Sequence, residues 1–187
     1  MKTKGLCFMG LVSFVRHRFG QNTLYQILDG LVDDPEVFVG SLEPFRWYPS
    51  ELYSEIFEAV MGELGNGDPS FAREIGNEIS RLHQRLSPDD FVRAPDVDLQ
   101  AALNRFWLLY HSDGQISVIE DGKDFILRFS CPIRLTRSYM ECVAGWMENL
   151  VISWRMGYAI VSSDEPMELR MLRIGSSSAA NNSEWAA

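Results

Sequence analysis

Hydrophobic positions in the C-terminal third of the chain follow a helical period. Between Ser138 and Arg155, apolar side chains recur at i, i+3, i+4, i+7, i+11 and i+15, which places them on one face of a single helix. The members of this stripe are Tyr139, Cys142, Val143, Trp146, Leu150 and Trp154.

Strand-like runs flank this helix on both sides. Residues 115–120 and 124–130 are joined by Asp121-Gly122, a strong hairpin signal, and residues 158–162 and 168–174 surround a second turn. The order strand–strand–helix–strand–strand predicts a ββαββ unit, in which the amphipathic helix covers an antiparallel sheet.

The upstream two thirds of the chain keep a period of 3.6 and predict helices. Ala72 and Gly76 lie four residues apart on a face away from the apolar stripe, where a neighbouring helix could come close. Residues 42–49 read as a loop. Capping residues and stripes place the helices over 3–18, from Asn22 to a break at Asp33, from Pro49 to Leu64, over 69–86 and over 97–111.

These elements predict one α+β domain over residues 1–174. Its N-terminal helical part, residues 1–111, is expected to pack on a C-terminal ββαββ antiparallel-sheet part, residues 112–174. A hydrophobic content of 46% with 23% charged residues is typical of a globular protein. Residues 175–187 are rich in Ser, Ala and Asn, which predicts a disordered tail.

The formal net charge of −9 is concentrated in one segment. Residues 29–63 contain nine acidic residues against the single base Arg46, so this segment alone carries −8. Such a field repels phosphate backbones, which argues against nucleic-acid binding, and it favours a basic protein partner. Glu51, Glu55 and Glu58 are the candidate partner-binding face. The alternative is a solvated surface that keeps the protein soluble.

Three cysteines, Cys7, Cys131 and Cys142, form no closely spaced pair, which indicates reduced thiols and a cytoplasmic protein. The uncharged run over residues 5–15 is too short to span a bilayer. We therefore expect no membrane span. The sequence leaves the oligomeric state open.

Several short motifs carry a resemblance to a known family. Lys4-Gly5 and Arg18-Phe19-Gly20 bound a helix that resembles the start of haem–nitric oxide/oxygen-binding (H-NOX) domains. Cys131-Pro132, followed by the helix of Cys142 and Trp146, is similar to four-vinyl-reductase-type small-molecule-binding domains. Together with Trp47-Tyr48-Pro49 and residues 67–72, these motifs resemble an uncharacterised bacterial family of H-NOX-like proteins.

The resemblance implies an H-NOX-like fold and raises the question of haem. H-NOX domains ligate iron through a histidine and hold the haem propionates with a Tyr-x-Ser-x-Arg set. Here Tyr110 and Ser112 match the first two positions, but Gly114 stands in place of the arginine. The candidate iron ligands are His83 and His111. His83 lies on a polar helix flank and is expected to be solvated, as is His17 between two arginines. We therefore expect no haem and, for lack of ligand spacing, no other metal.

Aromatic residues define a candidate ligand pocket between the helical part and the sheet. The pocket residues are Trp47, Tyr48, Trp107, Tyr110 and Trp146. The alternative is that these side chains are ordinary core. Cys131, just before the amphipathic helix, is the best candidate for an activated thiol, since a helix N-terminus lowers the pKa of a nearby thiol; the alternative is a small buried side chain.

Three functional hypotheses follow in order. The first is a non-enzymatic signalling or protein-interaction module on an H-NOX-like fold that has lost haem. The second is a sensor that binds haem or another apolar small molecule between the two parts. The third is a thiol-dependent enzyme that uses Cys131.

Overall fold

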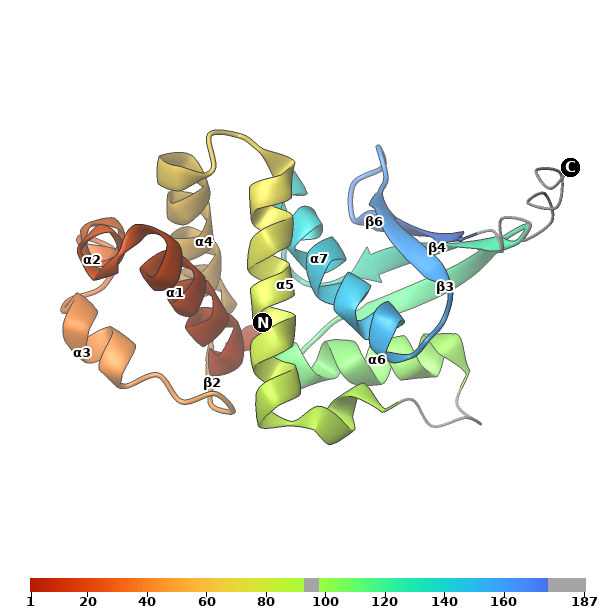
Figure 1. Ribbon diagram of the computed structural model, residues 1–187, viewed down its shortest axis with the longest axis horizontal. Helices are drawn as coiled ribbons and strands as arrows, with labels where there is room; N and C mark the ends of the chain where they lie inside the picture. Colours follow the sequence, from red (N-terminus) through yellow and green to blue (C-terminus); the bar gives the residue numbers. More distant parts are fainter. Residues whose placement is uncertain (93–97, 175–187) are drawn as a thin grey trace, which may run out of the picture.

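The structure, a computed structural model, describes residues 1–92 and 98–174. Its N-terminal helices and its C-terminal sheet lie side by side along the long axis of the molecule (Figure 1). This arrangement confirms the predicted α+β class and the order of the two parts. The predicted disordered tail, residues 175–187, and Val97, where the last upstream helix was expected to begin, lie outside the described residues.

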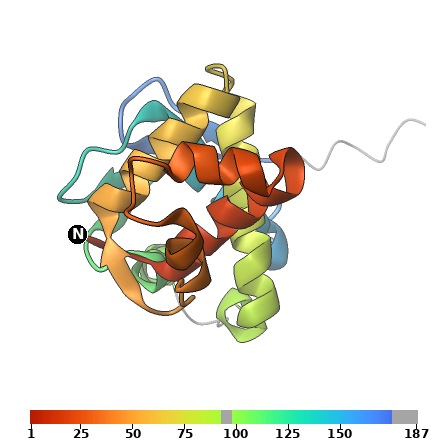
Figure 2. The same ribbon diagram turned by 90° about the vertical axis from the view of Figure 1, so that its left-hand side faces the viewer.

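Helices make up most of the N-terminal part, and Figure 2 looks onto their outer side. Asp34 was expected only to break the second helix, but its carboxylate accepts hydrogen bonds from the backbone N–H groups of Glu36 and Val37 and so begins another helix. None of the helices described is long and apolar enough to cross a bilayer. The helices are α1 (Gly5–Phe19), α2 (Gln21–Leu28), α3 (Pro35–Gly40), α4 (Ser50–Leu64), α5 (Pro69–Leu86), a short 3-10 turn (Pro88–Phe91) and α6 (Leu99–Tyr110).

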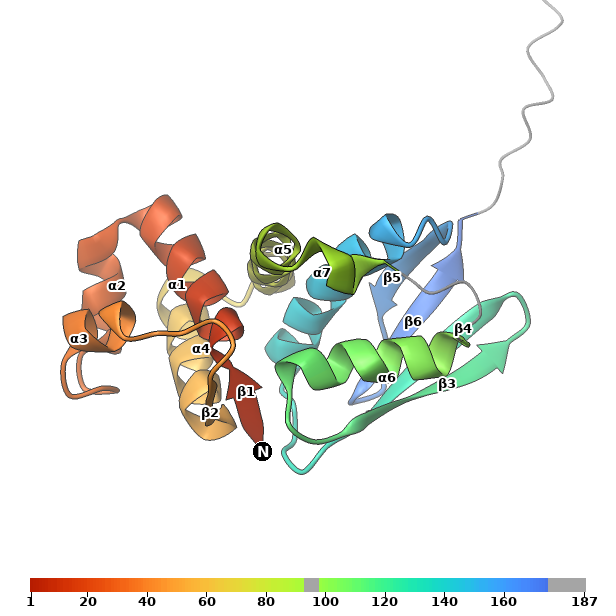
Figure 3. The same cartoon turned by 90° about the horizontal axis from the view of Figure 1, so that it is seen from below.

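The C-terminal part is a four-stranded antiparallel sheet with one long helix against it. Its strands occur in the order β3 (Gln115–Asp121), β4 (Asp124–Ser130), β6 (Glu168–Arg173) and β5 (Tyr158–Ser162). The two predicted hairpins therefore meet through β4 and β6, with Leu127 opposite Leu169. The helix α7 (Arg137–Ser153) contacts β5 and β6, while α6 runs beside β3 (Figure 3). The predicted stripe is confirmed from Tyr139 to Leu150, since each of its residues is buried.

A second, two-stranded sheet was not predicted. Residues 3 and 4, expected to begin the first helix, belong to β1 (Lys2–Lys4). Residues 47–49, expected to be a loop, form β2 (Trp47–Pro49). The strands pair antiparallel with Thr3 opposite Tyr48. Each strand has only three residues, so the local pattern carries no alternation to reveal it, and their pairing depends on a contact between distant segments.

Close contact between α5 and α7 joins the helical part to the sheet part. A Cβ atom at Gly76 would lie 1.8 Å from the backbone oxygen of Cys142, and one at Gly145 would lie 2.0 Å from the backbone oxygen of Arg73. Each helix therefore presents a glycine to the backbone of the other. The close approach predicted at Ala72 and Gly76 is confirmed, and α7 is the helix that uses it.

An ion-pair network reinforces the same contact. The guanidinium of Arg73 on α5 contacts Glu141 at 2.9 Å and Glu148 at 2.6 Å, both on α7. It also donates to the Ile160 carbonyl and the Ser162 hydroxyl of β5, at 3.1 and 3.0 Å. The Glu141 side chain is only 7% exposed, so its charge depends on this partner. One arginine thus ties α5 to α7 and to the sheet.

Replacing Gly76 with alanine should destabilise the fold, because the added methyl group meets backbone that cannot move aside. We expect a loss of about 1–3 kcal/mol in the free energy of unfolding, measured by urea denaturation. Gly62→Ala is the matched control, since Gly62 also lies in a helix but has no atom within 4 Å of the new Cβ position. There, alanine should stabilise by up to about 1 kcal/mol. Equal effects of the two substitutions would contradict the close contact.

Candidate functional site

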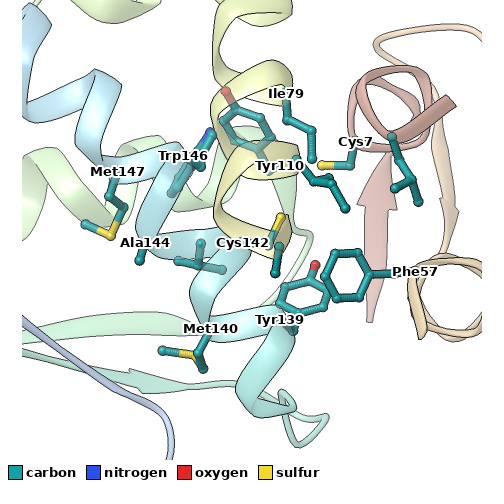
Figure 4. Close-up of a cluster of buried hydrophobic side chains, with 14 of the residues drawn as sticks. Cys7, Phe57, Ile79, Tyr110, Tyr139, Met140, Cys142, Ala144, Trp146 and Met147 are labelled. Carbon is teal, nitrogen blue, oxygen red and sulfur yellow. The ribbon is translucent and has the colours of Figure 1, made fainter. Parts of the chain in front are cut away.

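A small internal cavity lies where α1, α4, α5 and α6 of the helical part meet α7. Its volume is about 30 Å³. Figure 4 shows Cys7 of α1, Tyr110 of α6, and Tyr139, Cys142 and Trp146 of α7 converging on this region. The remaining lining residues are Tyr53, Ile79, Trp107, His111 and Val143.

The structure brings together three of the five predicted pocket residues. Trp107, Tyr110 and Trp146 all line the cavity. Trp47 and Tyr48 lie elsewhere, because both belong to β2. Trp47 is 37% exposed, with the Lys4 ammonium 3.9 Å from its ring centroid. The Tyr48 hydroxyl accepts a hydrogen bond from the Glu43 backbone N–H.

Sequence reasoning left several lining residues out of the pocket. Tyr139, Cys7 and Cys142 lie on the apolar faces of their helices, where they are indistinguishable from ordinary core. Only the tertiary structure shows that they surround one space.

His83 is buried, which corrects the expectation that it is solvated. It is 2% exposed and lies against the rings of Phe91 and Phe106. Its Nε2 lies 2.9 Å from the Asp90 carboxylate, and its Nδ1 bonds to the Tyr110 hydroxyl. Burial lowers the pKa of His83, with the Asp90 carboxylate opposing that shift. The polar flank seen in the sequence is covered by the 3-10 turn that follows α5.

The direction of these hydrogen bonds follows from the protonation state of His83. A neutral imidazole has one N–H, and the Asp90 carboxylate can only accept, so Nε2 carries the proton. Nδ1 then accepts a hydrogen bond from the Tyr110 hydroxyl. The indole N–H of Trp146 faces the Tyr110 oxygen, and this interaction opposes the rise in the pKa of Tyr110 that burial causes.

His111 is buried on the cavity wall. It is 4% exposed, and its ring centroid lies 4.1 Å from that of Trp107. Its Nδ1 is 3.4 Å from the Thr3 hydroxyl, which is 2.8 Å from the Ser50 hydroxyl. Burial lowers the pKa of His111 to about 3. The imidazole is therefore neutral throughout the physiological range.

The thiols are inert by the same argument. Burial raises the pKa of Cys142 to about 12 and that of Cys7 well above its usual value. Cys131 was the best candidate for an activated thiol, with a small buried side chain as the alternative. Burial raises the pKa of Cys131, and the thiol donates to the Ile133 carbonyl. The start of α7 lies too far along the chain to act on this thiol. The helix begins at Arg137, and the side chain of its N-cap residue Thr136 accepts a hydrogen bond from the Tyr139 backbone N–H. All three cysteines are free thiols.

The predicted partner-binding face lies on α4. Glu51 and Glu55 are exposed and take part in none of the ion pairs of the described residues. Glu58 is exposed too, but its carboxylate accepts a hydrogen bond from the Thr136 hydroxyl at 2.6 Å. The only base in the segment, Arg46, pairs with Glu43. The negative charge of residues 29–63 is therefore almost entirely uncompensated within the segment.

Comparison with known proteins rests on structure, since no family model and no curated protein matches this sequence. A doubly substituted Tt H-NOX domain superposes with a TM-score of 0.65 at 12% identity, over 92% of this chain and 95% of that chain. The fold is that of an H-NOX domain. A single-substitution variant of the T. tengcongensis H-NOX domain gives a TM-score of 0.60 at 14% identity, over 88% and 93% of the two chains. An oxygen-binding H-NOX domain related to soluble guanylate cyclases gives 0.59 at 14%, over 90% and 91%.

Haem, which the H-NOX resemblance implies, does not fit the cavity of this chain. A pocket for a ligand of drug size or larger measures about 300–1,000 Å³, and the cavity measures about 30 Å³. His83 does not line the cavity, and both of its ring nitrogens are already hydrogen-bonded. His111 is therefore the one imidazole in the lining that could approach the iron. The lining contains no lysine or arginine to hold a propionate.

The Tyr-x-Ser match at residues 110–112 does not supply that anchor either. The Tyr110 hydroxyl bonds to His83, and the Ser112 hydroxyl accepts from the Lys2 backbone N–H. A Cβ atom at Gly114 would lie 2.9 Å from both Cys131 Cβ and the Ser130 backbone oxygen, so an arginine cannot occupy this place. Within residues 1–92 and 98–174, no cluster of three His, Cys, Asp or Glu side chains is arranged to hold a metal ion.

The buried histidines should make the fold sensitive to acid. In the unfolded chain a histidine titrates near pH 6.5, whereas His111 in the fold stays neutral to about pH 3. Between these values the unfolded state binds a proton that the folded state does not, so stability is full above pH 6.5 and falls as the pH is lowered. The slope is up to about 1.4 kcal/mol per pH unit for one proton.

Urea denaturation between pH 7 and pH 4.5 measures how the free energy of unfolding depends on pH. This dependence should be weaker for His111→Gln than for the unsubstituted protein. His17→Gln is the control, because His17 is exposed on α1 and its loss should leave the slope unchanged. Parallel profiles for the unsubstituted protein and His111→Gln would contradict the neutral, buried state of His111.

Proposed function

We propose that this chain is a haem-free, non-enzymatic signalling module that uses the H-NOX fold to make protein contacts. The observation that carries the proposal is the closure of the junction between the two parts. Gly76 and Gly145 bring α5 and α7 into backbone contact, and the space that remains is about 30 Å³. The small size of this space supports a haem-free role on a fold whose neighbours include an oxygen-binding H-NOX domain.

The chemistry of the cavity wall supports a role without catalysis. General acid–base catalysis works best with a pKa near the operating pH. Burial moves the pKa of His111 to about 3 and that of Cys142 to about 12, in opposite directions away from neutrality. Cys131, the one candidate nucleophile, has a raised pKa. The three free thiols fit a reducing compartment such as the cytoplasm.

The acidic segment supports a protein partner of opposite charge. Exposed carboxylates of Glu51 and Glu55 on α4 have no compensating base, so their field extends into solvent and attracts cationic groups. The same field disfavours nucleic acid. The contact surface of this chain therefore includes the exposed, acidic side of α4, and the surface of the partner is basic.

A second candidate function is the binding of a small apolar molecule at the same junction. The aromatic wall of Trp107, Tyr110 and Trp146 favours it, and the volume limits the ligand to a few atoms unless α5 and α7 separate.

Addition of haemin to the purified protein should produce no Soret band of a ligated haem. It should also leave the melting temperature unchanged, since only a ligand that binds the folded state raises that temperature. His111→Ala serves as the control, as it removes the only neutral imidazole on the cavity wall that is free to coordinate. A Soret band that is present in the unsubstituted protein and lost in His111→Ala would contradict the haem-free proposal.

Reversal of charge on α4, in the double variant Glu51→Lys/Glu55→Lys, should weaken binding to the natural partner roughly tenfold or more at low salt. The partner is first identified by native mass spectrometry of the complex from the source organism, and affinities are then measured by titration. Glu120→Lys/Glu165→Lys changes the net charge equally, at exposed sites on the sheet part, and should leave affinity unchanged. Equal affinities for the two double variants would rule out α4 as the contact.

A further inference from the structure

A second cavity lies on the sheet part, between the start of α7 and the turn that joins β5 to β6. Its volume is about 460 Å³, within the range of about 300–1,000 Å³ that is typical of small-molecule sites. Residues 134–137 line one side, residues 162–168 line the other, and Met140 and Glu141 of α7 complete the lining. None of these residues lines the cavity of about 30 Å³ described above, so the two sites are separate.

Three apolar side chains give this cavity an apolar wall. Leu135 and Met140 are 5% and 6% exposed. The Met167 sulfur accepts a hydrogen bond from the Leu135 backbone N–H at 3.3 Å, which holds the Met167 side chain in place. Methionine side chains adapt their shape to an apolar group that packs on them. An occupant of this cavity therefore has an apolar part.

The buried carboxylates of the lining are already paired. Glu141 contacts Arg73 at 2.9 Å, and Glu168 contacts Arg128 at 2.9 Å. Their charges are therefore compensated within the protein and do not select the occupant.

Charges of both signs remain uncompensated around the cavity. Arg134 and Arg137 are exposed on one side. Asp164 is exposed in the turn on the other side, with Glu165 next to it in the sequence. None of these side chains takes part in the ion pairs of the described residues, so the opposite charges around the cavity do not reach one another. A molecule with both an anionic and a cationic group would bridge the gap.

The start of α7 adds to the positive side of the cavity. A helix N-terminus favours anions and disfavours cations. The first turn of α7 contains Arg137 but no acidic residue. A carboxylate near Arg137 therefore meets the positive end of the helix and a guanidinium, which binds carboxylates through two parallel hydrogen bonds.

We propose that this cavity binds a small zwitterionic molecule with an apolar side chain, which is the chemistry of an apolar α-amino acid. Arg134, Arg137 and the start of α7 bind its carboxylate. Asp164 binds its ammonium group, and its side chain packs against Met140 and Met167. The lining shares no residue with the acidic face of α4, so the proposal does not depend on the partner contact made there.

Thermal denaturation of the purified protein with single amino acids at millimolar concentration tests the site. L-leucine, L-methionine or L-phenylalanine should raise the melting temperature, because a ligand that binds the folded state stabilises it. Glycine carries the same charged groups without a side chain and should raise it less. No rise with any of the three apolar amino acids, or an equal rise with glycine, would overturn the proposal.

Derivatives of the amino acid that binds separate its two charged groups. The N-acetyl derivative lacks the ammonium group, and the amide lacks the carboxylate. In calorimetric titrations each should bind at least about tenfold more weakly, because one side of the cavity is left without a counter-charge. Full affinity of the N-acetyl derivative would mark a simple anion site at the start of α7 and would overturn the proposal, as would full affinity of the amide.

Arg137→Gln and Asp164→Asn should each weaken binding of the same amino acid roughly tenfold or more. Arg155→Gln is the matched control for the arginine. Arg155 is exposed just past the other end of α7 and takes part in none of the ion pairs of the described residues, so its loss should leave the affinity unchanged. Equal affinities of Arg137→Gln and Arg155→Gln would overturn the proposal, as would full affinity of Asp164→Asn.

Discussion

The backbone contact between α5 and α7 determines how the rest of the molecule is arranged. Gly76 admits the backbone of Cys142, and Gly145 admits the backbone of Arg73. Two reciprocal contacts fix both the distance between the helices and their register along the axis. Arg73 then adds polar bonds to α7 and to β5 from the same place. The helical part and the sheet part are therefore held as one unit by a contact that leaves no room for a side chain.

This contact explains the character of the site. With α5 and α7 at backbone distance, the aromatic side chains of α6 and α7 turn toward one another: the rings of Phe106 and Trp146 stack at 4.8 Å, and those of Tyr110 and Trp146 meet edge to face at 4.5 Å. Aromatic side chains fill this part of the junction. What remains is a cavity of about 30 Å³ with no Lys, Arg, Asp or Glu in its lining.

Local pattern was sufficient for the elements that are long and amphipathic. The stripe from Tyr139 to Leu150 placed α7 against the sheet, and Asp121-Gly122 placed the first hairpin. The spacing of Ala72 and Gly76 even indicated a close helix contact.

The pattern failed where a residue's environment depends on a distant segment. His83 appears polar in sequence, yet Phe91 and Phe106 cover it. Trp47 appears apolar, yet its strand lies at the surface. Cys131 appears close to a helix start that lies six residues further on. At Gly114 the sequence shows that a side chain is missing, and only the structure shows that a Cβ atom there would meet Cys131 and Ser130.

The first strand has a consequence for how the chain folds as it is made. The backbone N–H of Lys2 donates to the Ser112 hydroxyl, that of Ser112 donates to the Lys2 carbonyl, and Thr3 bridges to His111. Residues at the very start of the described chain thus find their partners more than a hundred positions later. A nascent helical part cannot be completed on the ribosome before α6 has left the exit tunnel, and its apolar faces stay open until α7 follows. Assembly of the early helices is therefore expected to occur late and cooperatively.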